Sequence, residues 1–196
     1  MSPPYTLHPN PYTLWNPMKL TKQQQEFLMR EALDEAKRGV AAGEAPIGCV
    51  IARGEGDNLR VVARGHNEGN ARQQPTAHAE IMAFANGASQ NGQPPALPPD
   101  ADDAILVSTL EPCVMCLGAA MEGGIKTVLF GLKAPADNGT TRVKPPESPE
   151  SSNPEIVGDI LAQESRRLFV DWLRGKEDTK QAEFVKQLLA LTPEVG

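Results

Sequence analysis

Apolar positions recur at helical spacing near the start of the chain and predict an amphipathic helix. Thr21 followed by Gln24 has the form of a capping box, in which each side chain accepts a hydrogen bond from a backbone N–H at the helix start. The apolar positions that follow fall on one helical face: Phe27, Leu28, Ala32, Leu33, Ala36 and Val40. Because Gly43 is the type of residue that ends helices, we expect the helix to stop there.

Short apolar runs bounded by turn residues predict strands. The run 47–52, a turn over 54–58 and the run 60–65 together predict a β-hairpin. The run 104–109 is rich in β-formers and predicts a buried strand, and 127–130 predicts another. Four further helices follow from the same spacing argument, at 79–88, 113–121, 160–173 and 181–191.

Three stretches lack any regular pattern. Residues 1–19 contain five prolines, and we interpret them either as a flexible arm or as an arm docked on the body or on a partner subunit. The stretch 86–103 is rich in Gly, Pro, Gln and Asp and predicts an exposed loop. The stretch 134–154 is rich in Pro, Ser and Glu, so regular structure is not expected there.

The alternation of strands and helices predicts an α/β fold, with helices packed around one sheet. A chain of 196 residues is long enough for one well-buried domain and short for two. We therefore expect an N-terminal arm over 1–19, one globular domain over 20–175 and a helical extension over 176–196.

The composition narrows the class of protein. No apolar run approaches the length that crosses a bilayer, and the N-terminus lacks the basic start and apolar core of a signal peptide, so a cytoplasmic protein with no membrane partner is expected. A net charge of -6 gives no general attraction to nucleic acid phosphates. The three cysteines, two of them in a Cys-x-x-Cys pair, suit a reduced compartment and a metal site.

Two short segments carry the chemistry. The segment 76–80 (TAHAE) supplies His78 and Glu80, and the segment 109–116 (TLEPCVMC) supplies Cys113 and Cys116. One imidazole and two thiolates suit a zinc site with three protein ligands and an open fourth position, the arrangement of catalytic zinc. Glu80 would then stand beside a water at that position, without binding the metal, as a general acid and base. This pattern matches the H-x-E…P-C-x-x-C signature of zinc deaminases.

The local structure expected at the cysteines supports this interpretation. At a helix start, free N–H groups and the positive end of the helix dipole stabilise thiolates, and the i, i+3 spacing puts both sulfurs on one face. A structural zinc knuckle would need a second Cys-x-x-Cys or paired histidines, which the chain lacks. A redox pair would leave His78 and Glu80 unexplained. We interpret Cys49 as a small buried residue and His66 as a structural hydrogen-bonding group, whereas Glu111 could support the site or cap nearby backbone.

Beyond these residues, the chain resembles the cytidine deaminase-like superfamily, and within it the bacterial tRNA-specific adenosine deaminases and related purine and nucleoside deaminases. The segments that carry the resemblance are 43–48 (GEAPIG), 65–67 (GHN), 75–82, 109–120 and 155–162. The resemblance implies a three-layer α/β/α sandwich around a mixed sheet of about five strands. It also implies a homodimer and a Zn²⁺ ion held by His78, Cys113 and Cys116.

The resemblance further implies how a base would be held. The side-chain amide of Asn67 and the backbone N–H of Ala79 would contact its edge. Pro46, Ile47 and Leu110 would wall the pocket.

The function that follows is hydrolytic deamination, in which the exocyclic amine of a nucleobase or nucleoside, with a purine expected, is replaced by oxygen and ammonia leaves. Editing members of the family tend to carry Arg-Asp after the strand that matches 128–131, where this chain reads Leu132-Lys133-Ala134, and they tend to have a basic final helix. Here the basic residues of 174–194 are matched by acidic ones. This cancelled charge favours a small nucleobase or nucleoside over RNA. The alternative is a tRNA-specific adenosine deaminase that converts wobble adenosine to inosine.

Overall fold

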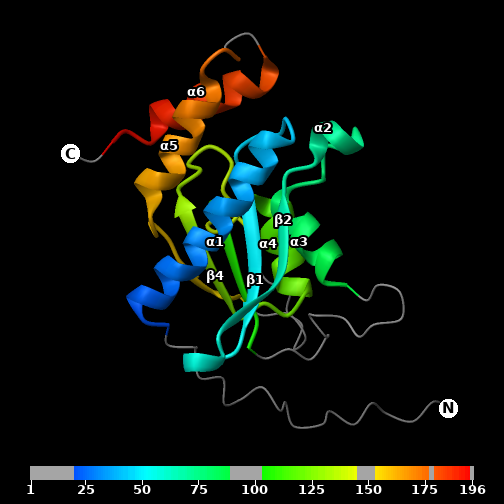
Figure 1. Cartoon of the computed structure of the whole chain (residues 1–196), viewed down its shortest axis with the longest axis vertical. Helices are drawn as coiled ribbons and strands as arrows, with labels where there is room; N and C mark the ends of the chain where they lie inside the picture. Colours follow the sequence, from blue (N-terminus) through cyan, green and yellow to red (C-terminus); the bar gives the residue numbers. More distant parts are fainter. Residues whose placement is uncertain (1–19, 89–102, 145–152, 177–178, 195–196) are drawn as a thin grey trace, which may run out of the picture.

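The computed structural model describes residues 20–88, 103–144, 153–176 and 179–194 (Figure 1). The predicted arm 1–19 lies outside the described residues, as do 89–102 and 145–152 of the two predicted loops. In chain order the helices and strands are α1 (Lys22–Ala41), β1 (Gly48–Arg53), the 3-10 turn η1 (Gly56–Asn58), β2 (Arg60–His66), α2 (Gly69–Arg72), α3 (Ala79–Gly87), β3 (Ile105–Leu110), α4 (Val114–Glu122), β4 (Thr127–Leu132), β5 (Glu155–Val157), α5 (Ala162–Leu173) and α6 (Lys180–Leu191).

The five strands form one mixed sheet in the order β2-β1-β3-β4-β5. The strand β1 runs antiparallel to both β2 and β3, whereas β3, β4 and β5 are parallel to one another. Helices α1 and α5 cover one face of the sheet, and α3 and α4 cover the other (Figure 1). The predicted three-layer α/β/α sandwich around about five strands is therefore confirmed.

The central strands are buried on both faces, which explains their near-continuous apolar sequence. Successive side chains of a strand point to opposite faces, so each central strand feeds two cores. In β1, Cys49 and Ile51 pack with α3 and α4, whereas Val50 packs with α1. In β3, Leu106 joins the first core and Val107 the second.

The first helix is the one that the spacing predicts, with one exception in its buried face. Thr21 is the N-cap, its hydroxyl accepts from the Gln24 N–H at 3.2 Å, and the Gln24 side chain accepts from the Thr21 N–H at 2.9 Å, so the capping box is present. The inclusion of Phe27 in the buried face is wrong, because Phe27 is 49% exposed while Leu28 is fully buried. The apolar stripe of α1 therefore begins one residue later.

Two short elements were not expected from the pattern. Helix α2 has four residues and strand β5 has three, and neither length holds a full period of hydrophobic spacing. The predicted hairpin, the strands and the longer helices agree with the structure to within a few residues. No helix among the described residues has both the length and the apolar character that a membrane span requires.

A third core joins the C-terminal helices to the end of the sheet. Phe169 and Trp172 of α5 and Val185 and Leu188 of α6 pack with Leu110 and Leu132, the last residues of β3 and β4. Ile47, which precedes β1, is packed against this cluster as well. The C-terminal helices therefore support the same edge of the sheet at which β3 ends.

Gly65 allows α3 to pack closely against β2, and we expect its replacement to destabilise the fold. A Cβ atom at Gly65 would lie 2.3 Å from the Ala83 nitrogen and 2.5 Å from the Ala79 carbonyl oxygen, both of which are helix backbone atoms that cannot move independently. Gly65→Ala is expected to lower the free energy of unfolding by about 1–3 kcal/mol, the usual cost of overpacking, as measured by urea denaturation.

Gly118 offers the matched control for this substitution. It lies inside α4, and a Cβ atom there would meet nothing within 4 Å. Because alanine is favoured over glycine inside helices, Gly118→Ala should raise stability by up to about 1 kcal/mol. Equal effects of the two substitutions would contradict the packing argument.

Candidate active site

The candidate site lies where three strand ends meet at one edge of the sheet. Since β1 is antiparallel to its neighbours, its start lies beside the ends of β2 and β3. The chain leaves β3 through Glu111 and Pro112 to Cys113, the N-cap of α4, and His78 is the N-cap of α3. Two helix N-termini therefore point their free N–H groups toward one place.

The structure brings together His78, Cys113 and Cys116. Their ligand atoms all lie within 4.8 Å of one another. His78 Nδ1 is 3.5 Å from Cys116 Sγ and 3.7 Å from Cys113 Sγ. Zn²⁺ binds sulfur at about 2.3 Å and nitrogen at about 2.0 Å in tetrahedral sites, which separates neighbouring ligand atoms by roughly 3.6 Å. The spacing and the donor types therefore fit Zn²⁺.

The two thiols differ in their proton affinity. A hydrogen bond from Cys116 and the nearby His78 lower the pKa of Cys113 to about 3. The pKa of Cys116 is raised by its hydrogen bond to Cys113, by burial and by the neighbouring Glu80. The hydrogen bond with Cys113 also raises the pKa of His78. The lowered pKa of Cys113 favours the thiolate, which is the form that binds metals.

Glu80 lies in the first turn of α3 and is only 4% exposed. Burial raises the pKa of its carboxyl group, and hydrogen bonds from Cys116 and Ser108 act in the opposite direction. The Ser108 hydroxyl donates to Glu80 Oε1 at 2.9 Å. Ser108 has no distinctive spacing in the sequence, where it stands beside Thr109 in the strand segment ILVSTL.

The two groups expected to contact a base contact each other in this structure. The Ala79 N–H donates to Asn67 Oδ1 at 2.9 Å, and the Asn67 N–H donates to the Ile47 carbonyl at 3.2 Å. The Asn67 Nδ2 group donates no hydrogen bond to the described part of the chain. The side-chain nitrogen of Asn67 is therefore the part of its amide that can donate to a ligand.

The three residues expected to wall a pocket lie around the same edge. Pro46 is buried, Ile47 is partly buried against the α3–α4 core and the third core, and Leu110 is almost fully buried. The loop that carries Pro46 and Ile47 is held by Glu44. That side chain, buried and not selected from the sequence, accepts from the N–H groups of Asn70 and Ala71 at 3.1 and 2.8 Å.

The Glu44 main chain is held by a residue of α5. Trp172 Nε1 of α5 donates to the Glu44 carbonyl at 2.8 Å. Only the three-dimensional structure reveals this contact, because 128 residues separate the two partners.

Three further residues have structural contacts. Glu111 accepts from the Ala134 N–H at 2.9 Å and from the Thr140 hydroxyl, so it caps the loop that follows β4. His66 Nδ1 lies 2.8 Å from Glu35 Oε1, a structural hydrogen bond as interpreted from the sequence. Cys49 is fully buried in the α3–α4 core and is not part of the metal-ligand cluster.

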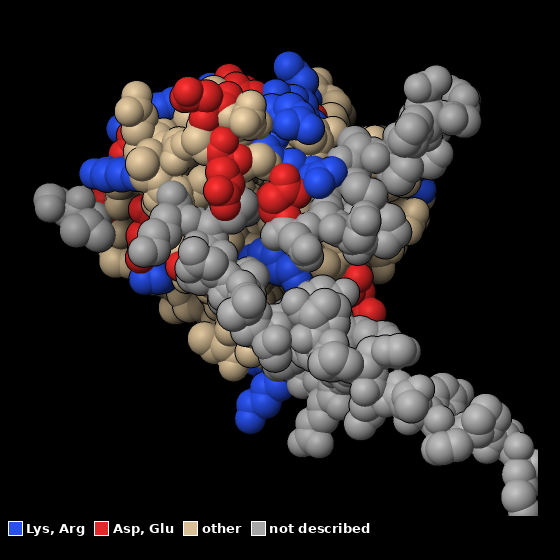
Figure 2. Space-filling view, turned by 90° about the horizontal axis from the view of Figure 1, so that it is seen from below, with Lys and Arg blue, Asp and Glu red and all other residues tan. Residues whose placement is uncertain are grey.

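Three basic side chains in or next to the C-terminal helices are paired with carboxylates. The pairs are Arg166–Glu194 at 2.9 Å, Arg174–Asp171 at 3.3 Å and Lys186–Glu183 at 3.1 Å. Near the end of β4, Lys133 pairs with Asp159 at 2.8 Å. At the opposite end of the molecule, which carries η1, Figure 2 also shows both signs of charge interspersed. Such pairing weakens any positive field that would attract a phosphate backbone.

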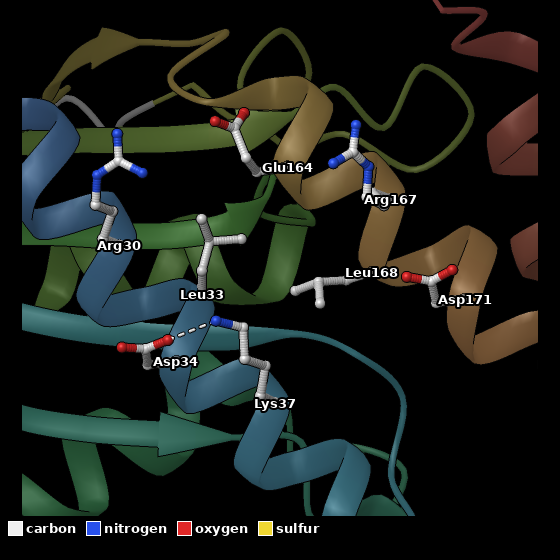
Figure 3. A pocket seen from close by; sticks show the side chains of 8 residues that line it. All are labelled: Arg30, Leu33, Asp34, Lys37, Glu164, Arg167, Leu168 and Asp171. Carbon is white, nitrogen blue, oxygen red and sulfur yellow. Dashed lines mark hydrogen bonds and ion pairs between the residues drawn. The ribbon is translucent and has the colours of Figure 1, made fainter.

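A cavity of ≈ 330 Å³ lies elsewhere, between α1 and α5 (Figure 3). Leu33 and Leu168 contribute its apolar surface, and three cationic and three anionic side chains surround them. The Lys37 ammonium donates to Asp34 at 2.7 Å within it. None of the predicted site residues lines this cavity, which is on the face of the sheet away from α3 and α4.

Comparison with known proteins agrees with this geometry. Residues 22–132 match the family model of the cytidine and deoxycytidylate deaminase zinc-binding region, a span that contains all three candidate ligands and Glu80. The "tRNA-specific adenosine deaminase" of Bacillus subtilis is 31% identical over 161 residues, which cover 81% of this chain and 94% of that protein.

Two other matches are shorter or structural. The "tRNA-specific adenosine deaminase" of Streptococcus pyogenes is 37% identical over 114 residues, and the chain spans 66% of that relative. A solved structure from a study of A-to-I editing by tRNA:A34 deaminases at the wobble position superposes with a TM-score of 0.57 and 28% identity. That match covers 72% of this chain and 98% of the solved one.

Proposed function

Because the chain belongs to the cytidine deaminase-like superfamily, we propose that it is a zinc-dependent hydrolytic deaminase. It replaces the exocyclic amine of a nucleobase or nucleoside, with a purine as the expected ring, by oxygen and releases ammonia. The observation that carries this proposal is the buried Glu80 beside three convergent metal-ligand atoms. A purely structural zinc site would have no use for that carboxylate.

The proposed chemistry assigns one role to the metal and one to the chain. His78, Cys113 and Cys116 would hold Zn²⁺, and the ion would supply a water made acidic enough to act as a nucleophile near neutral pH. Glu80 takes one proton from the attacking water and delivers it to a ring nitrogen, and it then takes the proton of the new hydroxyl group and delivers it to the departing amine. The bond from the ring carbon to oxygen forms, the bond to nitrogen breaks, and the net reaction consumes one water for each ammonia.

The chain's other residues orient the ring in this proposal. Asn67 donates from Nδ2 to an acceptor on the base edge, while its Oδ1 stays near the Ala79 N–H, which can be shared with the ligand. Pro46, Ile47 and Leu110 enclose the ring with apolar surface. The third core supports Ile47 and Leu110 from behind, so the C-terminal helices fix the shape of that wall.

The paired charges of α5 and α6 favour a free base or nucleoside as the substrate, because binding an RNA backbone needs uncompensated cations. The alternative is a tRNA-specific adenosine deaminase that converts wobble adenosine to inosine. The names of the relatives from Bacillus subtilis and Streptococcus pyogenes favour that second candidate. A cytoplasmic location and a homodimer stay predictions from the sequence.

Ammonia release tests the proposal directly. The zinc-loaded protein would be assayed with guanine, adenine, cytosine, their nucleosides and an anticodon stem-loop RNA. We expect release from a free purine base or nucleoside, with little from the RNA. Release from the RNA alone would replace the first candidate by the second, and no release from any member of the panel would contradict deamination of these substrates.

A further inference from the structure

We propose that Ser108 is a positioning residue for the reaction: its hydroxyl holds Glu80 Oε1, so that Oε2 is the carboxylate oxygen that moves the proton. This inference rests on the proposed deaminase function. Its basis is the 2.9 Å hydrogen bond from Ser108 Oγ to Glu80 Oε1, made by two residues that are 0% and 4% exposed.

The strand geometry explains why Ser108 meets Glu80. Side chains alternate along β3, and Leu106, two residues earlier, lies in the core against α3 and α4. Ser108 therefore points to the same layer, from which the first turn of α3 presents Glu80. Its partner across the antiparallel pair is Cys49, which is also fully buried. The hydroxyl thus lies between an apolar core and the carboxylate.

Among the described residues, two other buried hydroxyl groups serve the main chain instead, and those of Thr127 and Ser165 have no partner there. The next residue, Thr109, accepts from the Gly48 N–H at 3.1 Å, and Thr192 donates to the Leu188 carbonyl at 2.7 Å. These bonds join or complete secondary structure. The Ser108 bond joins a strand to the side chain of the proposed acid and base, and it adds nothing to the backbone ladder. Its place is therefore explained by what it does to Glu80.

The effect of the bond is to restrict the carboxylate. A glutamate side chain has several rotamers, and its two oxygens exchange when the carboxylate rotates. A donor fixed on a central strand removes both freedoms, because β3 pairs with β1 and β4 on its two sides. Ser108 therefore acts through Glu80 and does not itself contact the reacting atoms.

The test is Ser108→Ala, assayed with the purine base or nucleoside of the panel above that gives the fastest turnover. We expect kcat to fall about 10- to 100-fold, the usual cost of removing a group that orients a site residue. KM should stay within about twofold and bound zinc at the wild-type level, because neither the base contacts nor the metal ligands change. Ser108→Thr, which keeps the hydroxyl, should recover most of the lost kcat.

Ser165→Ala is the matched control, since Ser165 is equally buried and its hydroxyl has no partner among the described residues. It should leave kcat unchanged. A second check combines Ser108→Ala with Glu80→Ala: the double variant should be no slower than Glu80→Ala alone, because Ser108 acts only through Glu80.

Three results would overturn the role of Ser108. They are an unchanged kcat in Ser108→Ala, a loss of zinc, or a further loss of activity in the double variant. If the wild-type protein released no ammonia from any substrate, the proposed function would fail and this role with it. If the wild type were fully active and Ser108→Ala had the same kcat, only the role of Ser108 would be refuted, and the proposed function would stand.

Discussion

Glu80→Ala is expected to retain its zinc and to lose about 10²- to 10⁴-fold in the rate of ammonia release. Glu80 is not one of the three candidate ligand residues, so the metal content should equal that of the wild type. The carboxylate, in contrast, is the group that transfers protons in the proposed reaction, and general acid–base catalysis contributes typically 10²–10⁴-fold. Zinc stoichiometry and steady-state ammonia release on the same preparation measure the two effects.

The control for this variant is Glu122→Ala. Glu122 lies at the exposed end of α4 and is far from the convergent ligands along that helix. It should release ammonia at the wild-type rate. A Glu80→Ala variant that retained most of its activity would refute the role of Glu80 as the acid and base, whatever its metal content.

The sequence predicted the parts of the fold that are encoded locally. The capping box at Thr21 and the apolar stripe of α1 depend on residues a few positions apart, and so does the hairpin of β1 and β2. Phe27 was misassigned because hydrophobic spacing defines a face only to within about one residue at a helix end. Helix α2 and strand β5 are too short for any periodic signal.

The same holds for the candidate site: residues with a specific local spacing can be predicted from the sequence, and residues that act through distant partners cannot. His78, Glu80, Cys113 and Cys116 could be selected because their spacing within two short segments is chemically specific. Ser108 and Glu44 could not, because their roles depend on partners that only the folded sheet brings close. A buried serine in a strand and a glutamate before a proline-containing loop have no distinctive spacing. Their partners, 28 and 26 residues away, are visible only in the structure.

The pocket wall that we propose explains why the choice of substrate is harder to predict than the chemistry. The family match ends at residue 132, yet Trp172 of α5 binds the Glu44 carbonyl, and α6 packs with Leu110. The surfaces around the ring are therefore set partly by helices outside the matched region. The metal site and Glu80 lie wholly inside it. Reaction class and substrate class thus depend on different parts of the chain.

Cys116→Ala is expected to weaken zinc binding at least about 100-fold and to lower thermal stability. Its sulfur is one of three ligand atoms, and His78 Nδ1 lies only 3.5 Å from it. A metal that binds the folded chain stabilises it by mass action, so a 100-fold loss of affinity removes about 2.7 kcal/mol at a fixed free zinc concentration. Competition with a chromogenic chelator measures the affinity, and thermal unfolding with and without zinc measures the stabilisation.

Cys49→Ala is the control that distinguishes a loss of zinc binding from the destabilisation caused by a cavity in the core. Both thiols are fully buried, but Cys49 belongs to the α3–α4 core and is not part of the ligand cluster. Cys49→Ala should lower the melting temperature of the zinc-bound and the zinc-stripped protein by similar amounts, because a core cavity costs the same in both. In Cys116→Ala, the difference between those two melting temperatures should nearly vanish. A difference equal to that of the wild type would mean that Cys116 does not bind the metal.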